Sequence, residues 1–119
     1  MFARVRSAAV LGIEAYVVGV ETDLDNKLPS FTTVGLAEGA VKESKERVSS
    51  AIKNSGYFFP QKRVTINLSP ADIRKEGSAF DLPIAIGILA ADGRIPLEEL
   101  DKYILMGESL WKRLINMYL

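Results

Sequence analysis

Residues 2–10 show a patchy alternation of apolar and polar residues, with the period of two that is typical of β-strands. Two runs rich in β-branched and aromatic residues, 2–10 and 13–20, flank Gly12, and this arrangement predicts a hairpin. Residues 21–30 are dense in turn formers and predict a loop. A third strand is expected over residues 31–34.

The next segment changes to the period of an amphipathic helix, which Gly56 brings to an end. Its apolar side consists mainly of small residues: Ala37, Ala40, Val41, Ser44, Val48, Ala51, Ile52 and Ser55. Glu38 stands four residues before Lys42, and this order favours an ion pair on one helix face. Glu43 and Arg47 have the same spacing, so each pair should contribute about 0.2–0.5 kcal/mol.

The clearest alternation lies in residues 62–68, where the apolar residues at 64, 66 and 68 share one face. Pro70 ends this strand. Further along, residues 96–100 predict a short helical turn and residues 103–106 a last strand. The predicted order is therefore β-β-β-α-β-α-β.

Residues 80–91 are apolar on nearly all sides, so they predict a buried helix that Gly93 closes. Two caps are compatible with its N-terminus. Either Ser78 caps the helix and Asp81 completes a capping box, or Asp81 is itself the cap and Pro83 lies in the first turn.

Composition excludes several kinds of chemistry. The 119 residues suit a single domain, and the absence of Cys and His excludes disulfides, thiolate or imidazole metal sites and Ser-His triads. Fifteen basic and fifteen acidic residues balance, but residues 41–75 hold eight basic and three acidic ones. Neither a bilayer-length apolar run nor a signal peptide pattern is present, so we expect a cytoplasmic protein with no membrane partner.

The residues offer little for a cofactor or a metal ion. No Gly-x4-Gly-Lys-[Ser/Thr] phosphate loop occurs, so no ATPase activity is expected from this chain itself. Asp23 and Asp25 form a weak metal pattern and are better explained as a solvated turn. A Ser-Lys dyad could involve Lys75 with Ser78, or Ser69, but Ser78 is more simply explained as a helix cap.

The basic middle third predicts a surface that could contact the phosphates of DNA. The alternative is an ordinary solvated helix face. The candidate residues come from the polar side of the first helix, the polar face of the fourth strand and the loop after it: Lys42, Lys45, Lys53, Arg63, Arg74 and Lys75.

Four stretches together resemble a known family: residues 34–36, 40–48, 51–56 and 67–85. They are similar to the N-terminal domain of magnesium-chelatase-like AAA+ ATPases of the ComM/YifB type. The most specific stretch includes Glu76, Gly77, Ser78, Asp81 and Pro83.

This resemblance implies an α+β fold like that of ribosomal protein S5 domain 2, which the Lon protease domain shares, with a mixed sheet and helices packed on one face. It covers residues 1–108, which we expect to be a domain truncated at its C-terminal side, whereas residues 109–119 form a divergent tail. Laid against the Lon active-site segment, Ala79 stands at the position of the nucleophile. The resemblance therefore implies no catalytic residue here.

In function, the resemblance implies a noncatalytic accessory domain that serves subunit assembly or DNA engagement in DNA uptake, recombination or branch migration. Its expected partners are the AAA+ motor domain and neighbouring subunits of a homo-oligomer, and DNA. ATP and Mg²⁺ would belong to the motor, and no cofactor or metal is expected in this chain. The alternatives are a Lon-type Ser-Lys hydrolase, a stand-alone nucleic-acid-binding module and a chelatase subunit acting on a tetrapyrrole.

Overall fold

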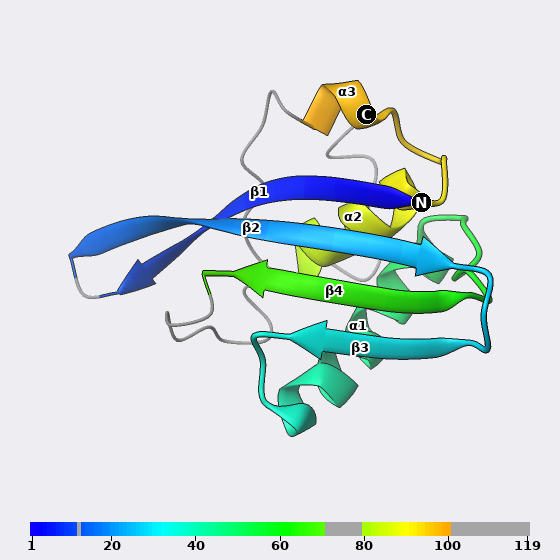
Figure 1. Ribbon diagram of the computed structural model, residues 1–119, viewed down its shortest axis with the longest axis horizontal. Helices are drawn as coiled ribbons and strands as arrows, with labels where there is room; N and C mark the ends of the chain where they lie inside the picture. Colours follow the sequence, from blue (N-terminus) through cyan, green and yellow to red (C-terminus); the bar gives the residue numbers. More distant parts are fainter. Residues whose placement is uncertain (12, 71–79, 101–119) are drawn as a thin grey trace.

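The computed structural model describes residues 1–11, 13–70 and 80–100. The chain folds as an α+β domain (Figure 1). Its elements, in order, are β1 (Phe2–Leu11), β2 (Glu14–Asp25), β3 (Ser30–Val34), α1 (Glu38–Asn54), β4 (Arg63–Ser69), α2 (Asp81–Ala91) and α3 (Leu97–Leu100). The strand expected at 103–106, the boundary at 108 and the tail 109–119 lie outside the described residues. Within those residues, no helix has the length and apolar character needed to cross a membrane.

The four strands form one mixed sheet in the order β1-β2-β4-β3. β2 pairs antiparallel with both β1 and β4, whereas β3 runs parallel to β4. The predicted hairpin is confirmed, with Leu11 opposite Glu14. β4 pairs with β2 only from Gly19 onward, so the outer part of the hairpin projects beyond the sheet as an arm (Figure 1).

The loop predicted over residues 21–30 is wrong in its first half. β2 continues to Asp25 because Thr22 and Leu24 are buried on the core face, and because this stretch pairs with strands on both sides. Burial against neighbouring strands has overridden the turn-forming tendency of the acidic residues.

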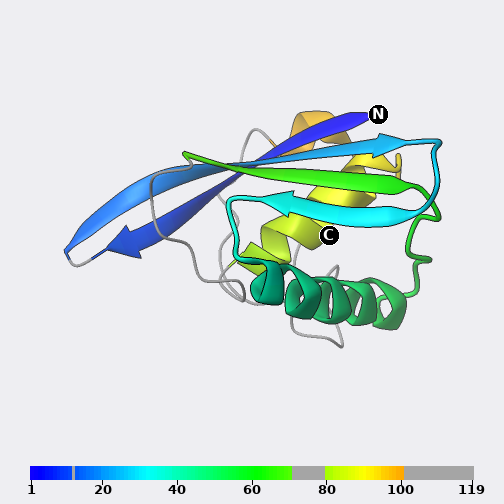
Figure 2. The same cartoon turned by 60° about the horizontal axis from the view of Figure 1, so that its bottom comes forward.

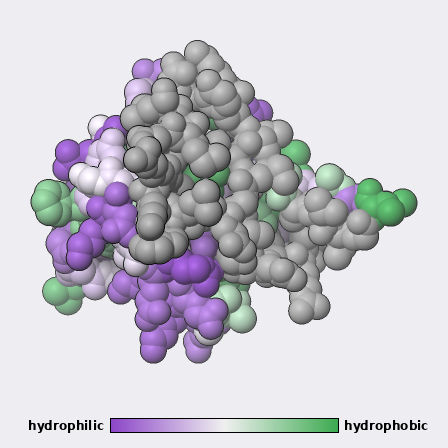
Figure 3. All heavy atoms as spheres, turned by 180° about the vertical axis from the view of Figure 1, so that it is seen from behind, coloured by the Kyte–Doolittle hydropathy of each residue, from purple (hydrophilic) through white to green (hydrophobic). Residues whose placement is uncertain are grey.

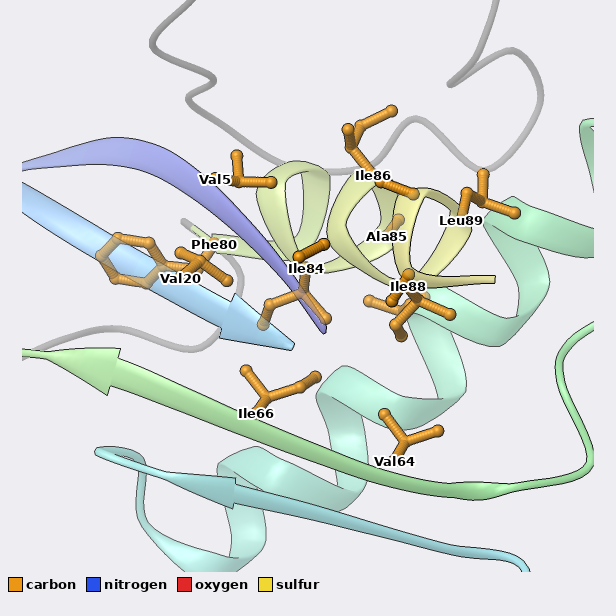
Figure 4. Close-up of a cluster of buried hydrophobic side chains, with 14 of the residues drawn as sticks. Val5, Val20, Val64, Ile66, Phe80, Ile84, Ala85, Ile86, Ile88 and Leu89 are labelled. Carbon is orange, nitrogen blue, oxygen red and sulfur yellow. The ribbon is translucent and has the colours of Figure 1, made fainter. Parts of the chain in front are cut away.

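Both long helices cover the same face of the sheet (Figure 2). The side chains at positions 64, 66 and 68 of β4 are fully buried on that face, as their alternation predicted. Ile84 and Ile88 of α2 point toward the sheet, where Ile66 of β4 lies (Figure 4). The opposite face of the sheet carries most of the polar residues of the strands, together with the exposed apolar residues Phe2, Val17 and Val34.

α2 is buried nearly all round, as predicted: ten of its eleven residues are buried. Asp81 is not the cap, because Phe80 is the N-cap residue of α2 and its side chain forms no capping hydrogen bond. Ser78, the other predicted cap, lies outside the described residues. Asp81 is the first helical residue, and its carboxylate turns toward α1. A Cβ added at Gly87 would lie 2.7 Å from the hydroxyl of Thr22, so glycine allows α2 to approach β2 closely.

α1 ends as the sequence predicted. Gly56 adopts a φ of +90°, and the Tyr57 amide donates a hydrogen bond of 3.1 Å to the carbonyl of Ile52. Of the two predicted ion pairs along α1, Glu43 approaches Arg47 at 3.8 Å. The pair between Glu38 and Lys42 is not formed, and both side chains are exposed.

Candidate functional site

Three of the predicted phosphate contacts lie on the exposed side of α1. Lys42, Lys45 and Lys53 are all exposed, and none of them forms an ion pair with another residue in the described part of the chain. Seen from behind, hydrophilic residues gather over this helix at the bottom of the molecule (Figure 3). The structure therefore brings these three lysines together along one element.

Glutamates interrupt this row of lysines. Glu38, Glu43 and Glu46 are exposed on the same helix. Glu46 stands four residues after Lys42, a spacing that places the two side chains next to each other on the helix surface. The exposed side of α1 is consequently a mixture of both charges rather than a uniformly positive stripe.

Arg63 does not join the lysines. It stands at an odd position of β4, on the face of the sheet that the helices leave open, whereas its neighbour Val64 points into the core. Its guanidinium donates two hydrogen bonds to one carboxylate oxygen of Asp25, at 2.5 and 3.2 Å. These hydrogen bonds hold the pKa of the Asp25 carboxyl below its ordinary value of 3.8.

Asp23 and Asp25, the two acids of the weak metal pattern, each lie beside a cation of the protein. Asp25 is bound to Arg63, and Asp23 lies 3.7 Å from the N-terminal ammonium group. Each acid thus has a cation of its own, and among the described residues no group of three acids converges on a point.

A partly buried ion pair joins the two long helices, with its carboxylate buried and its guanidinium partly exposed. Asp81, whose side chain is fully buried, accepts hydrogen bonds from Arg47 at 2.5 and 3.2 Å and from the Ser44 hydroxyl at 3.3 Å. Because the guanidinium meets both carboxylate oxygens, the pair fixes orientation as well as distance. Asp81 therefore acts here as a bridge between α1 and α2.

The remaining candidates of the family motif and the basic loop fall in a segment that the structure leaves undescribed: Arg74, Lys75, Glu76, Gly77 and Ser78. Pro83 is buried in the first turn of α2, where one of the two capping alternatives put it, although Asp81 is not the cap. Ser69, the other serine considered for a dyad, is half-buried at the end of β4, next to Gly19 of β2.

Three cations of the basic middle third are neutralised by acids from the flanking thirds. Arg47 pairs with Asp81, and Arg63 pairs with Asp25. Lys62 lies 3.6 Å from a carboxylate oxygen of Asp92. These three pairs offset part of the charge asymmetry along the sequence, which sequence counting alone could not reveal.

Sequence reasoning also missed a hollow at the C-terminal end of α1. It measures about 410 Å³ and is lined by Ser49, Lys53, Gly56, Tyr57, Phe58 and Phe59. The signal that could have revealed it is the run of three aromatic residues directly after the helix-ending glycine.

Comparison with known proteins identifies relatives for most of the chain. Residues 20–112 match the family described as subunit ChlI of Mg-chelatase. The uncharacterized protein YifB of Escherichia coli is 51% identical over 104 residues, which are 87% of this chain and 21% of YifB.

Two further relatives come from other bacteria. Competence protein ComM of Haemophilus influenzae is 48% identical over 104 residues, 87% of this chain and 20% of ComM. An uncharacterized protein of Mycobacterium tuberculosis is 39% identical over 105 residues, 88% of this chain and 21% of that protein. The chain thus spans about a fifth of the length of these curated relatives.

Proposed function

Since the chain belongs to the family of subunit ChlI of Mg-chelatase, in its ComM/YifB type, we propose that it is a noncatalytic accessory domain of an AAA+ ATPase. Its role is to hold the motor and neighbouring subunits of a cytoplasmic homo-oligomer together. In this proposal ATP and Mg²⁺ bind to the motor, which belongs to the part of the protein beyond these residues. The domain has the fold of ribosomal protein S5 domain 2, with which its mixed sheet and one-sided helices agree.

The internal pairing of cations is the observation that supports protein contact over DNA contact. Arg47, Lys62 and Arg63 are engaged by acids of the same chain. A surface that follows a nucleic-acid backbone needs several clustered cations, because each neutralised phosphate adds to the affinity. The described surface offers mixed charges instead, together with an exposed aromatic ring, and such a surface suits a protein partner.

The experiment is complementation in trans. A YifB variant that lacks its 104 matched residues is mixed with the present chain, and assembly with ATP is followed by analytical ultracentrifugation. We expect the chain to co-sediment with the shortened protein and to restore the assembly size of intact YifB. The proposal is wrong if the chain sediments alone and the shortened YifB assembles as well without it.

DNA engagement is the second candidate function, and one observation favours it. Lys42, Lys45 and Lys53 are exposed and, within the described residues, free of carboxylate partners. The relative ComM is a competence protein, and a role of the whole protein in DNA uptake, recombination or branch migration would agree with that name.

A further inference from the structure

The hollow at the end of α1 presents an apolar surface that the described residues leave uncovered. Phe58 keeps 86% of its surface exposed, and Tyr57 and Phe59 on either side are half-buried. Removing apolar surface from water is favourable, so a partner that covers this ring gains stability from it.

The walls of the hollow are held in place before any partner arrives. The Tyr57 amide is bonded to the Ile52 carbonyl at 3.1 Å. The ring of Phe59 packs against that of Phe31 in β3, with 6.3 Å between ring centroids, and Pro60 is buried. Because the residues around Phe58 are fixed, binding here costs little ordering of the chain.

The residues that line the hollow favour a negatively charged ligand. Lys53 is a lining residue with an exposed side chain, and no carboxylate is among the described lining residues. The hollow therefore combines aromatic rings with one nearby cation. A ligand that combines an apolar group with one carboxylate would complement it.

A chain of phosphates fits this surface less well. Glu46 is exposed and stands seven residues before Lys53, which places it on the same side of α1. A nucleic-acid strand that ran from the hollow along the helix would meet this carboxylate, and like charges repel.

From this geometry we propose that the hollow is a docking site for a peptide segment of a protein partner that carries an aromatic or aliphatic side chain next to a carboxylate. The apolar side chain lies against Phe58, and the carboxylate pairs with Lys53. The inference rests on the proposed function only in assuming that the partner is a protein.

The test uses two small probes with the same apolar body and opposite charge, 3-phenylpropionate and 3-phenylpropylamine. Each is titrated into the full ¹⁵N-labelled chain, and amide shifts are followed by NMR. We expect saturable shifts at the lining residues with the propionate and about five-fold weaker binding of the amine, the factor expected for a partly exposed ion pair.

Variants with matched controls locate the site. Phe58→Ala and Lys53→Gln should each weaken the propionate about five-fold, and both change exposed side chains, so the fold is retained. Lys42→Gln on the same helix and Val17→Ala on the projecting arm, which is also exposed, should change nothing.

Three results would overturn the docking site. They are equal affinity for the two probes, an equal loss in Lys42→Gln, and tighter binding of a thymidine decanucleotide that Phe58→Ala abolishes. The last result would assign the hollow to single-stranded nucleic acid. If the trans complementation fails while the propionate shifts persist, the accessory role is wrong and the docking site stands.

Discussion

Asp81 shows how one residue can serve a purpose that its position in the sequence did not suggest. A carboxylate at the start of a helix is normally explained by capping or by the helix dipole. Here it is fully buried and bound by Arg47 from another helix, 34 residues earlier in the chain. A buried charge is tolerated only when it is paired, so the guanidinium is a condition for packing α2 onto α1.

Replacing Arg47 with Met should lower the free energy of unfolding by about 3 kcal/mol, because the buried Asp81 carboxylate loses its guanidinium. Urea unfolding followed by circular dichroism measures this change. Glu43→Gln is the matched control, since it removes only the exposed contact of 3.8 Å with Arg47 and should cost less than about 0.5 kcal/mol. Equal effects of the two substitutions would contradict the role given to the buried pair.

Gly87 should not tolerate a methyl group. In Gly87→Ala the new Cβ would stand 2.7 Å from the Thr22 hydroxyl, so we expect a loss of about 1–3 kcal/mol in the free energy of unfolding. The Thr22 hydroxyl is buried and has no hydrogen-bond partner among the described residues. Thr22→Ala should therefore restore most of the lost stability in the double variant, and a simple sum of the two single effects would argue against this contact.

At the scale of elements, α1 has a glycine near each end, and the two glycines differ in backbone conformation and surroundings. Gly56 has a positive φ in which other residues are strained, whereas Gly39 lies inside the first turn with open space around its Cα. The same substitution at the two ends of one helix should thus have opposite signs.

We expect Gly56→Ala to destabilise the domain by about 1 kcal/mol, because alanine is unfavourable at positive φ. Gly39→Ala should stabilise it by up to about 1 kcal/mol through helix propensity. Thermal unfolding of both variants beside the unchanged chain gives the two signs. A loss of stability in Gly39→Ala would show that this glycine has a contact the geometry does not indicate.

The exposed side of α1 also provides the test of DNA engagement. Changing Lys42, Lys45 and Lys53 together to Glu should weaken binding of single-stranded and duplex oligonucleotides equally across sequences and flatten its salt dependence. Fluorescence anisotropy at several salt concentrations measures both. Glu38→Gln with Glu46→Gln is the opposite control and should strengthen binding, whereas unchanged binding in the triple-lysine variant would move the contact elsewhere.

Most elements could be predicted from the sequence because their signals are local. The alternation at residues 64–68 predicts a strand that is buried on one face. The apolar run from Ile84 to Ala91 predicts a helix that is buried on nearly all sides. What could not be predicted depends on residues far apart in the chain. The extension of β2 to Asp25 depends on β4, and the neutralisation of Arg63 depends on Asp25, 38 residues away.

Across the whole molecule, the fold compensates the uneven charge of the sequence. Cations of the middle third meet acids from both ends, through Arg63 with Asp25 and Lys62 with Asp92. These contacts link the start, the middle and the end of the described chain. Stability should accordingly respond to acid as the Asp25 carboxylate is protonated, because its pKa is lowered in the folded chain.

The lowered pKa of Asp25 determines the direction in which stability changes with pH. Its pKa in the folded chain is lower than its ordinary value of 3.8, because Arg63 donates hydrogen bonds to its carboxylate. The stabilisation is therefore complete above that value and is lost as the pH falls through the folded-state pKa. Stability measured between pH 5 and about pH 2 should fall less steeply in Asp25→Asn than in the unchanged chain, and parallel curves would exclude this contribution.

A polypeptide still attached to the ribosome lacks α2, and this helix supplies ten buried residues to a sheet whose first two strands are synthesised long before it. At translation rates of about 5–20 residues per second, the stretch between the end of β2 and the end of α2 takes about 3–13 seconds to make. During that interval Val5, Val18 and Val20 of these two strands lack the helix that later packs on them. The nascent chain should thus be a substrate for ribosome-bound chaperones until α2 has been synthesised.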